Sequence, residues 1–162
     1  MWCEILINVI GTVIGGLLLA VILFFFNEYV FPICNISGEW NVEELTEKTS
    51  YNPYRNMKLF YKFHLLQTGN SITGSGEKIK ETLSDKKTFE YERKNRTTSV
   101  ISGYYERNFL RADKVYINIV ENGRQRQTRT SYILKVEKKK SMVGNFLSTI
   151  ADSSGQINMT KL

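Results

Sequence analysis

The most informative stretch of this chain for chemistry is 124–137, where basic, hydroxyl-bearing and aliphatic side chains alternate. One parity of this stretch carries Arg124, Arg126, Thr128, Thr130, Tyr132, Leu134 and Val136. In an extended strand these residues share one face, and the aliphatic pair at its end predicts that this face points into a core. Arginine on an inward face is costly unless it meets water or an anion. The pattern therefore favours an anion site lined by guanidinium groups.

Tyrosines elsewhere in the chain supply partner chemistry for such a site. Guanidinium groups bind phosphate through forked hydrogen bonds, and tyrosine rings stack on nucleobases. We predict a ligand site formed by Tyr61, Tyr105, Arg107, Arg124, Arg126, Thr128, Arg129 and Tyr132. Two alternatives stay open: the arginines lie in water at the strand ends, or they attract anionic lipid headgroups at about 1 kcal/mol per basic residue.

The chain lacks the residues that common catalytic and metal sites need. His64 is its single histidine, and Cys3 and Cys34 are its two cysteines, whereas a structural zinc site takes about four such ligands. The two cysteines flank an apolar segment too long for a disulfide between them. The glycine-rich stretch 73–78 lacks the Gly-Lys-Ser/Thr ending of a phosphate loop. We predict a non-enzymatic protein that needs no metal or cofactor and binds no DNA or RNA polymer.

The N-terminal part of the chain is apolar enough to cross a membrane. Residues 5–26 carry no charge, and at ~1.5 Å per residue they extend about 33 Å, slightly more than the ~30 Å hydrocarbon core. A signal peptide needs a basic start and a small-residue cleavage site. The chain instead begins Met1-Trp2-Cys3-Glu4, and three phenylalanines end the apolar run. We therefore expect a retained membrane helix with an interfacial flank over 5–31.

One face of this expected helix carries small and polar residues. Asn8, Gly11, Thr12 and Gly15 recur at spacings of three, four and seven. A small-xxx-small pair lets two helix backbones approach closely, and Asn or Thr can hydrogen-bond across the contact. The face predicts self-association of the helix, with chance as the alternative because glycine is common in membrane helices.

After the apolar segment the chain becomes basic and its periodicity changes. All 22 Lys and Arg residues lie from Lys48 onward, against 14 acidic residues after Glu28, a net charge of +8. From residue 36 apolar residues recur at alternate positions with turn residues about every ten, which predicts antiparallel strands. The expected strands are 38–45, 57–67, 72–79, 89–93, 97–107, 115–121, 125–137, 142–147 and 155–162.

These ranges make about eight antiparallel strands in sequential hairpins. They favour an all-β domain over 36–162, an eight-stranded antiparallel up-and-down barrel of lipocalin-like type. Closure removes the exposed edges that a flat sheet would leave; a two-sheet sandwich is the alternative. Asn122-Gly123 predicts a tight type I′ turn between two of the strands. Gly38 and Trp40 open the first strand in the manner of the Gly-x-Trp of lipocalin-like barrels, where the indole plugs one end.

In layout, the chain resembles the CD-NTase-associated protein 15 family, membrane-anchored β-barrel effectors of bacterial cyclic-oligonucleotide (CBASS) antiphage immunity. The similarity rests on the N-terminal span and on the order of the short segments 36–40, 66–70, 101–105 and 154–157. It implies a cytosolic barrel that binds a cyclic dinucleotide, oligomerises and disrupts the inner membrane, causing abortive infection. It also implies a cytoplasmic C-terminal domain, whereas the length of the apolar segment predicts a single-pass protein. This chain departs from the family in one respect. The family usually has a pair of N-terminal spans, whereas residues 5–31 have room for only one.

Two other functions remain open from the residues alone. A membrane-tethered, lipocalin-like carrier would hold an apolar small molecule in a cavity without arginine. A docking barrel would have a filled core and no ligand. Charge alone does not fix the orientation of the span, because the first basic residue, Lys48, lies beyond the ~15–20 flanking residues that the positive-inside rule weighs.

Overall fold

The computed structural model describes residues 2–30, 33–92, 96–108, 111–122 and 127–162, without the side chains of 27–30. The chain divides into two units, residues 1–34 and 35–162. The first is the helix α1 (Trp2–Val30). Its segment Trp2–Phe26 is long and apolar enough to cross a membrane and is not buried against protein. A helix of this length and composition fits a membrane anchor or a signal sequence.

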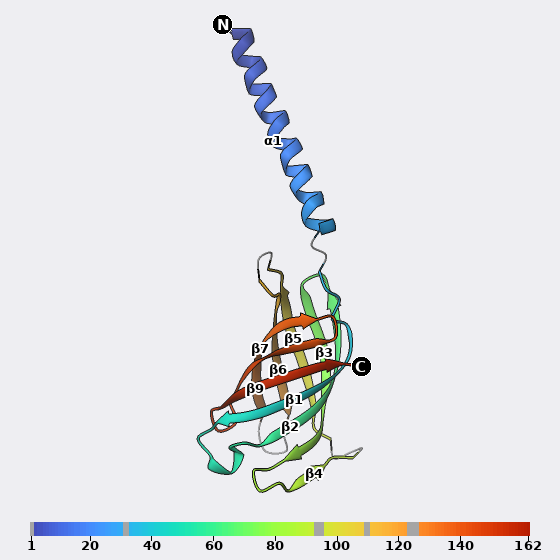
Figure 1. Ribbon diagram of the computed structural model, residues 1–162, viewed down its shortest axis with the longest axis vertical. Helices are drawn as coiled ribbons and strands as arrows, with labels where there is room; N and C mark the ends of the chain where they lie inside the picture. The colour runs from blue at the N-terminus through green and yellow to red at the C-terminus, as the bar shows by residue number, and fades with distance from the viewer. Residues whose placement is uncertain (1, 31–32, 93–95, 109–110, 123–126) are drawn as a thin grey trace. The chain divides into compact units, whose positions relative to one another are not determined.

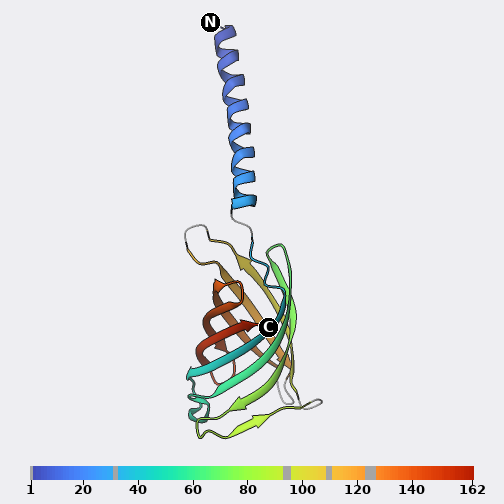
Figure 2. The ribbon, with the colours of Figure 1, turned by 45° about the vertical axis from the view of Figure 1, so that its right-hand side comes forward.

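The second unit is a closed antiparallel β-barrel (Figures 1 and 2). Its strands are β1 (Gly38–Lys48), β2 (Lys58–Thr68), β3 (Ser71–Thr82), β4 (Thr88–Glu90), β5 (Thr98–Glu106), β6 (Lys114–Asn122), β7 (Gln127–Lys138), β8 (Ser141–Ser148) and β9 (Ser153–Lys161), with a short 3₁₀-helix η1 (Asn52–Tyr54). The order β2-β1-β9-β8-β7-β6-β5-β3 closes through the β2–β3 pairing. Eight strands form the wall, and β4 adds to the end of β3 outside the circle.

This architecture confirms the predicted barrel of eight up-and-down strands. The expected strand 89–93 differs most, because the strand observed there is the three-residue β4 (Thr88–Glu90), which ends before Tyr91 and pairs with Lys80, Glu81 and Thr82 of β3. The expected two-residue turn at Asn122-Gly123 is also wrong in register. Glu121 pairs with Thr128 and Asn122 with Gln127, which leaves four residues between the paired positions. The turn itself, 123–126, lies outside the described residues.

Alternation along each strand places one set of side chains in the lumen. The two ends of the barrel are named here by the first and last residues of β1, the Gly38 end and the Lys48 end. At the Gly38 end and in the middle the lumen is filled with apolar side chains, whose largest members are Trp40, Phe63, Leu65, Ile72, Ile101, Tyr105, Ile117, Tyr132, Leu134, Met142 and Met159. These make the hydrophobic core of the domain.

Trp40 closes the Gly38 end, as the Gly-x-Trp pattern predicts. Its side chain is fully buried, and the indole N–H donates a 2.8 Å hydrogen bond to the Ile36 carbonyl. The Lys161 ammonium lies 5.8 Å from the ring centroid. Gly38 has a φ of +131°, and a Cβ there would lie 3.0 Å from the Lys161 side chain. Glycine therefore allows the chain to enter the barrel beside the indole.

Close approach of neighbouring strands also needs glycine in the barrel wall. A Cβ at Gly144 would lie 2.0 Å from the Ile133 carbonyl oxygen on β7, far inside van der Waals contact. The pair Leu134 and Gly144 is in register between β7 and β8. A strand can coil this tightly only where no side chain intervenes, which is what closure of a small barrel demands.

Candidate functional site: a polar lumen end and an outer groove

At the Lys48 end the lumen changes from apolar to polar. Five polar or charged residues are buried there or beside it: Glu44, Thr46, Ser99, Thr128 and Ser153. Around them lies a hollow of about 30 Å³, lined by residues that include Glu44, Tyr61, Glu121, Thr130 and Ser148. A water molecule needs ~10–15 Å³ on this measure. The hollow therefore has room for one or two waters.

Glu44 is the most unusual group in this end of the lumen. Its side chain is 3% exposed, and it accepts a hydrogen bond from the hydroxyl of Tyr132 on β7, on the far side of the lumen from β1. Burial raises the pKa of Glu44 from 4.5 to about 7, against the opposing effect of the Tyr132 hydrogen bond. Burial likewise raises the pKa of Glu121, an effect that Lys78 opposes. The carboxyl of Glu44 therefore exchanges its proton near neutrality.

The three tyrosines predicted to face nucleobases are core residues. Tyr61, Tyr105 and Tyr132 are 7%, 1% and 1% exposed. Tyr105 lies at the Gly38 end, where its hydroxyl donates to Asp113, 2.5 Å away. Tyr132 stacks on Phe63 in the middle of the barrel, with ring centroids 6.2 Å apart. The structure thus distributes these rings along the lumen and does not bring them together around an open space.

The basic residues of the predicted site are also separated. Thr128 is buried at the Lys48 end, but Arg129 has the opposite parity and is exposed on the outer face. Arg107 follows β5 at the Gly38 end. By register, Glu106 lies beside Lys114 and Lys135, seven residues along β7 from Thr128, or roughly 23 Å at ~3.3 Å per residue. Arg124 and Arg126 lie outside the described residues.

The described lumen therefore does not suit the dianionic ligand expected from the sequence. Small-molecule pockets measure ~300–1,000 Å³, an order of magnitude more than the hollow. Its end of the lumen also presents the carboxyl groups of Glu44, Glu81 and Glu121 against the ammonium of Lys78, which pairs with Glu81 at 2.5 Å. A phosphate placed there would meet net negative charge.

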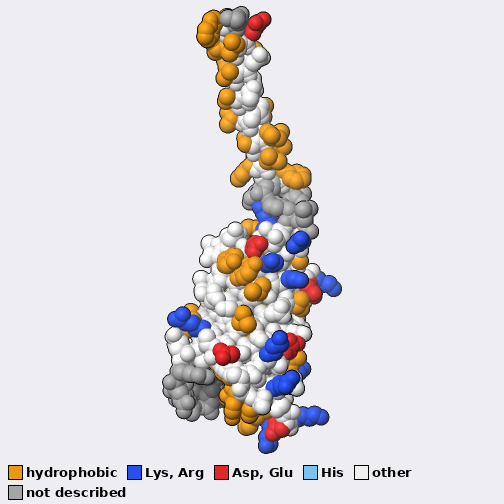
Figure 3. All heavy atoms as spheres, turned by 90° about the vertical axis from the view of Figure 1, so that its left-hand side faces the viewer, with side chains coloured by type: hydrophobic (Ala, Val, Ile, Leu, Met, Phe, Trp, Pro, Cys, Tyr) orange, Lys and Arg blue, Asp and Glu red, His pale blue; other side chains and the backbone are white. Residues whose placement is uncertain are grey.

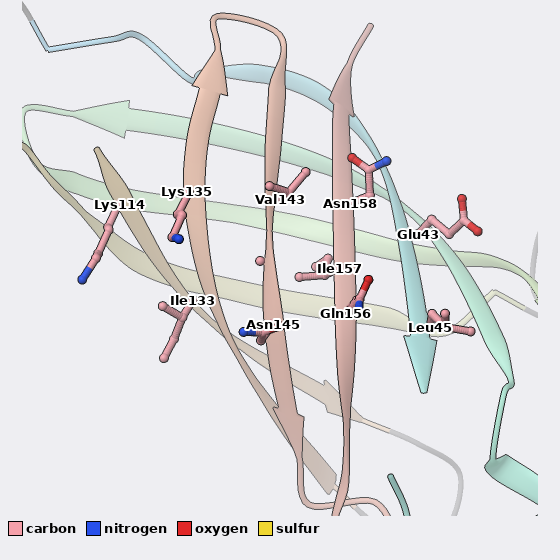
Figure 4. A pocket seen from close by; sticks show the side chains of 11 residues that line it. Glu43, Leu45, Lys114, Ile133, Lys135, Val143, Asn145, Gln156, Ile157 and Asn158 are labelled. Carbon is pink, nitrogen blue, oxygen red and sulfur yellow. The ribbon is translucent and has the colours of Figure 1, made fainter. Parts of the chain in front are cut away.

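A second and larger recess lies on the outer face of the barrel (Figure 4). It has a volume of about 580 Å³ and crosses strands β1, β6, β7, β8 and β9. Its lining consists of Glu43, Leu45, Lys114, Ile133, Lys135, Val143, Gly144, Asn145, Gln156, Ile157 and Asn158. We call it the outer groove. Its volume falls within the range of small-molecule pockets.

Two lysines give this outer groove its charge. Lys114 and Lys135 are direct register partners across β6 and β7, and Figure 4 shows them side by side at one end of the groove. Like charges directly opposite on a sheet are destabilising. Within the described part of the chain, neither ammonium has an ion-pair partner, whereas Glu43 is paired with Lys58 at 2.8 Å. Glu106 is the other register neighbour of Lys114, so two ammonium groups face one carboxylate here, and the net positive charge attracts an anion.

The remainder of the outer groove offers amides and apolar surface. Asn145 and Asn158 make no side-chain hydrogen bond with any described residue, and Gln156 donates to Glu47 at 2.7 Å. Ile133 is 48% exposed, and by register Asn145 and Gln156 lie between it and Leu45 at the other side of the outer groove (Figure 4). Free amides and aliphatic patches beside two ammonium groups match a ligand with phosphates, polar base edges and ring faces.

The sequence analysis did not identify this outer groove. Most of its residues occupy the outward-facing alternate positions of five strands. In the sequence these positions look like an ordinary solvated face. One signal was available, since Lys114 directly precedes the first strand of the predicted hairpin 115–121/125–137 and Lys135 lies near the end of the second. A two-residue turn at Asn122-Gly123 would pair Lys114 with Ser131, whereas the observed register pairs it with Lys135. The loop length therefore decided whether the two charges met.

The helix residues predicted for self-association lie open on α1. Nothing lies within 4 Å of a Cβ placed at Gly11 or Gly15. The Thr12 hydroxyl donates to the Asn8 carbonyl at 2.8 Å, so its proton is already used within the helix. The amide of Asn8 remains as the polar group of this face.

These features define the class of the protein as a closed eight-stranded antiparallel β-barrel that follows an apolar N-terminal helix. Among solved structures it matches a redesigned β-barrel, mFAP1, bound to DFHBI, with a TM-score of 0.51 and 11% sequence identity. The match covers 78% of this chain and 94% of that chain. At this identity the similarity shows the fold alone. No protein-family model and no curated protein matches the chain.

Proposed function

We propose that this protein is a membrane-anchored effector of CBASS antiphage immunity whose barrel binds a cyclic dinucleotide. Ligand binding favours an assembly of anchors that disrupts the bacterial inner membrane. The observation that carries this proposal is the outer groove, about 580 Å³ in volume, with two lysines in direct register that have no ion-pair partner among the described residues. An anion bound between Lys114 and Lys135 would relieve their mutual repulsion, so the positive charge of this site favours binding of a phosphate group.

The apolar helix supports the membrane part of the proposal. We place α1 across the inner membrane once, with the barrel in the cytoplasm, where a nucleotide synthase would deliver the ligand. The open face of Gly11 and Gly15 suits close packing of helices from several copies. The ligand shifts the population toward the assembly only if it binds the assembled form more tightly than the monomer.

Removing the two lysines tests the ligand site. We expect Lys114→Ala with Lys135→Ala to weaken binding of cyclic dinucleotides to the full chain in lipid nanodiscs by 100-fold or more, at about 1.5–3 kcal/mol per charged hydrogen bond. Affinity is measured by calorimetry over a panel of cyclic dinucleotides. Binding by the unaltered protein weakens as salt rises, because the contact is ionic.

Two further variants locate the ligand. Lys138→Ala with Lys139→Ala removes the same charge from exposed positions near the β7–β8 connection and leaves affinity unchanged. Arg124→Ala with Arg126→Ala tests the site that the sequence predicts. Loss of binding in the arginine variant alone places the ligand at that hairpin and rejects the outer groove. If no cyclic dinucleotide binds the unaltered protein, the function itself is rejected.

The helix face gives a separate prediction. Gly11→Leu with Gly15→Leu fills the open face, and we expect it to spare nucleotide affinity while abolishing ligand-dependent membrane leakage from vesicles. A matched control, Val13→Ala with Leu17→Ala, alters the opposite face of α1 and keeps leakage. Full leakage from the leucine variant excludes assembly through this face.

A docking barrel is the second candidate, and the filled lumen favours it. The hollow at the Lys48 end of the lumen measures only about 30 Å³, and large buried side chains fill the described lumen elsewhere, as expected of a scaffold. Figure 3 shows one outer face on which hydrophobic side chains are scattered among polar ones. In this case the lysine variant loses a protein partner and no nucleotide binds. The apolar-carrier alternative finds no support in the described lumen, which has no cavity of ligand size.

A further inference from the structure

The polar end of the lumen contains a hydrogen bond that joins two opposite walls of the barrel. Glu44 lies on β1 and Tyr132 on β7, and β9 and β8 separate these strands in the sheet order. The Tyr132 hydroxyl donates to Glu44 Oε1 where both side chains are buried. No backbone hydrogen bond links β1 to β7, so this contact ties them across the lumen.

Titratable groups face Glu44 from most of the surrounding strands. Strand β2 contributes Tyr61, β3 contributes Lys78 and Glu81, β6 contributes Glu121, and β7 contributes Tyr132, with Tyr91 beyond β4 close to Tyr61 and Glu81. Strands β8 and β9 present only uncharged groups to the hollow, Phe146, Ser148 and Ser153. Lys78 is engaged with Glu81. Lys78 therefore leaves a negative charge on Glu44, beside Glu81 and Glu121, with little compensation in the closed barrel.

The end of the lumen beside Glu44 is covered by the connection 49–57. Hydrogen bonds from Asn56 N–H to the Thr46 carbonyl (2.8 Å) and from Thr46 N–H to the Met57 carbonyl (3.0 Å) tie this connection to β1. Tyr54 and Met57 line the hollow from the connection between β1 and β2, and Ile150 lines it from the β8–β9 turn. Ser50 N–H donates to the Ala151 carbonyl at 2.7 Å, joining the two connections. Asn56, Ala151 and Asp152 have φ values of +60°, +49° and +45°. Such residues store strain that opening would release.

We propose that Glu44 is a proton-controlled latch: the Lys48 end of the barrel stays closed over the protonated carboxyl and lets water enter when the carboxyl ionises, while the hydrogen bond from Tyr132 opposes opening. The proton passes to bulk solvent, and the carboxylate left behind needs hydration that the closed hollow of one or two waters cannot supply. Opening of the connection 49–57 supplies it. This latch is independent of the proposed nucleotide site, because the outer groove contains neither residue.

Hydrogen–deuterium exchange of the full chain in nanodiscs tests the latch. Exchange rates are divided by the intrinsic rate of an unstructured peptide at the same pH. We expect protection of amides in 43–48 and 127–132 to fall about tenfold between pH 6 and pH 8, as proton linkage with the folded and ordinary pKa values of Glu44 requires. Amides of 101–105 at the Gly38 end keep their protection.

Three variants make the result decisive. Glu44→Gln cannot ionise and shows no pH-dependent loss of protection, whereas Glu43→Gln, on the outer face of the same strand, behaves as the unaltered protein. Tyr132→Phe removes the hydrogen bond that stabilises the carboxylate, so its loss of protection continues to higher pH. Equal protection of the unaltered protein at pH 6 and pH 8 overturns the proposal. So does a Glu44→Gln protein that still opens with rising pH; if that variant does not fold, the Tyr132→Phe profile decides.

Discussion

Replacing Trp40 by alanine is expected to lower the free energy of unfolding of the barrel by about 4 kcal/mol, within the ~3–5 kcal/mol typical of buried aromatic truncations. The side chain is fully buried, and its removal leaves a cavity at the closed Gly38 end. It also leaves the Ile36 carbonyl without its indole donor. Urea unfolding of the full chain in detergent, followed by circular dichroism of the β-sheet, measures the change.

Two control substitutions distinguish the loss of stability caused by the cavity from the loss caused by the missing hydrogen bond. Trp40→Phe keeps an aromatic ring but loses the N–H donor, so we expect a loss of about 1–3 kcal/mol. Thr160→Ala, at an exposed position of β9, changes stability by no more than about 0.5 kcal/mol. A Trp40→Ala protein as stable as the Thr160→Ala protein contradicts the assignment of Trp40 as the plug of the barrel.

The stability of the barrel is expected to fall as pH rises from 5 to 8, and Glu44 is the main cause. Its folded-state pKa, about 7, lies above the ordinary value of 4.5. Between these values the folded state binds more protons than the unfolded state, so the free energy of unfolding decreases with rising pH and levels off above 7. The total loss is up to about 3 kcal/mol.

Substitution of this one carboxyl checks the assignment. Glu44→Gln removes the ionisation, so its stability changes little between pH 5 and pH 8 and exceeds that of the unaltered protein at pH 8. Glu43→Gln disrupts only the exposed pair with Lys58 and keeps the pH dependence. Glu121→Gln reduces the slope in part, because burial raises the pKa of Glu121 in the same direction. A pH-independent unaltered protein would exclude an ionisable Glu44 in the lumen.

Periodicity in the sequence was sufficient to predict the barrel and the inward parity of most strands. Thr128, Tyr132 and Leu134 all face the lumen as expected, because side-chain direction in a strand follows directly from the alternation of residues. The Gly38-Trp40 pattern also predicted the plugged end. These features are local, so a short stretch of sequence contains all the information that they require.

The candidate site depended on long-range geometry. Parity placed Tyr61, Tyr105 and Tyr132 in the lumen, but whether a lumen is open or filled depends on the summed volume of side chains from eight strands. Likewise, the pairing of Lys114 with Lys135 follows from a connection two residues longer than the expected turn. A shift of register moves every cross-strand neighbour while leaving each strand's own pattern unchanged.

By itself the sequence determined an apolar helix of membrane-spanning length followed by a basic, all-β domain, because hydrophobic runs and alternation act over a few residues. Only the tertiary structure decided that the lumen is packed, that Glu44 meets Tyr132 across it, and that a recess of about 580 Å³ lies on the outer wall. Those outcomes arise where residues distant in sequence come into contact. Their burial and charge pairing depend on the closure of the whole sheet.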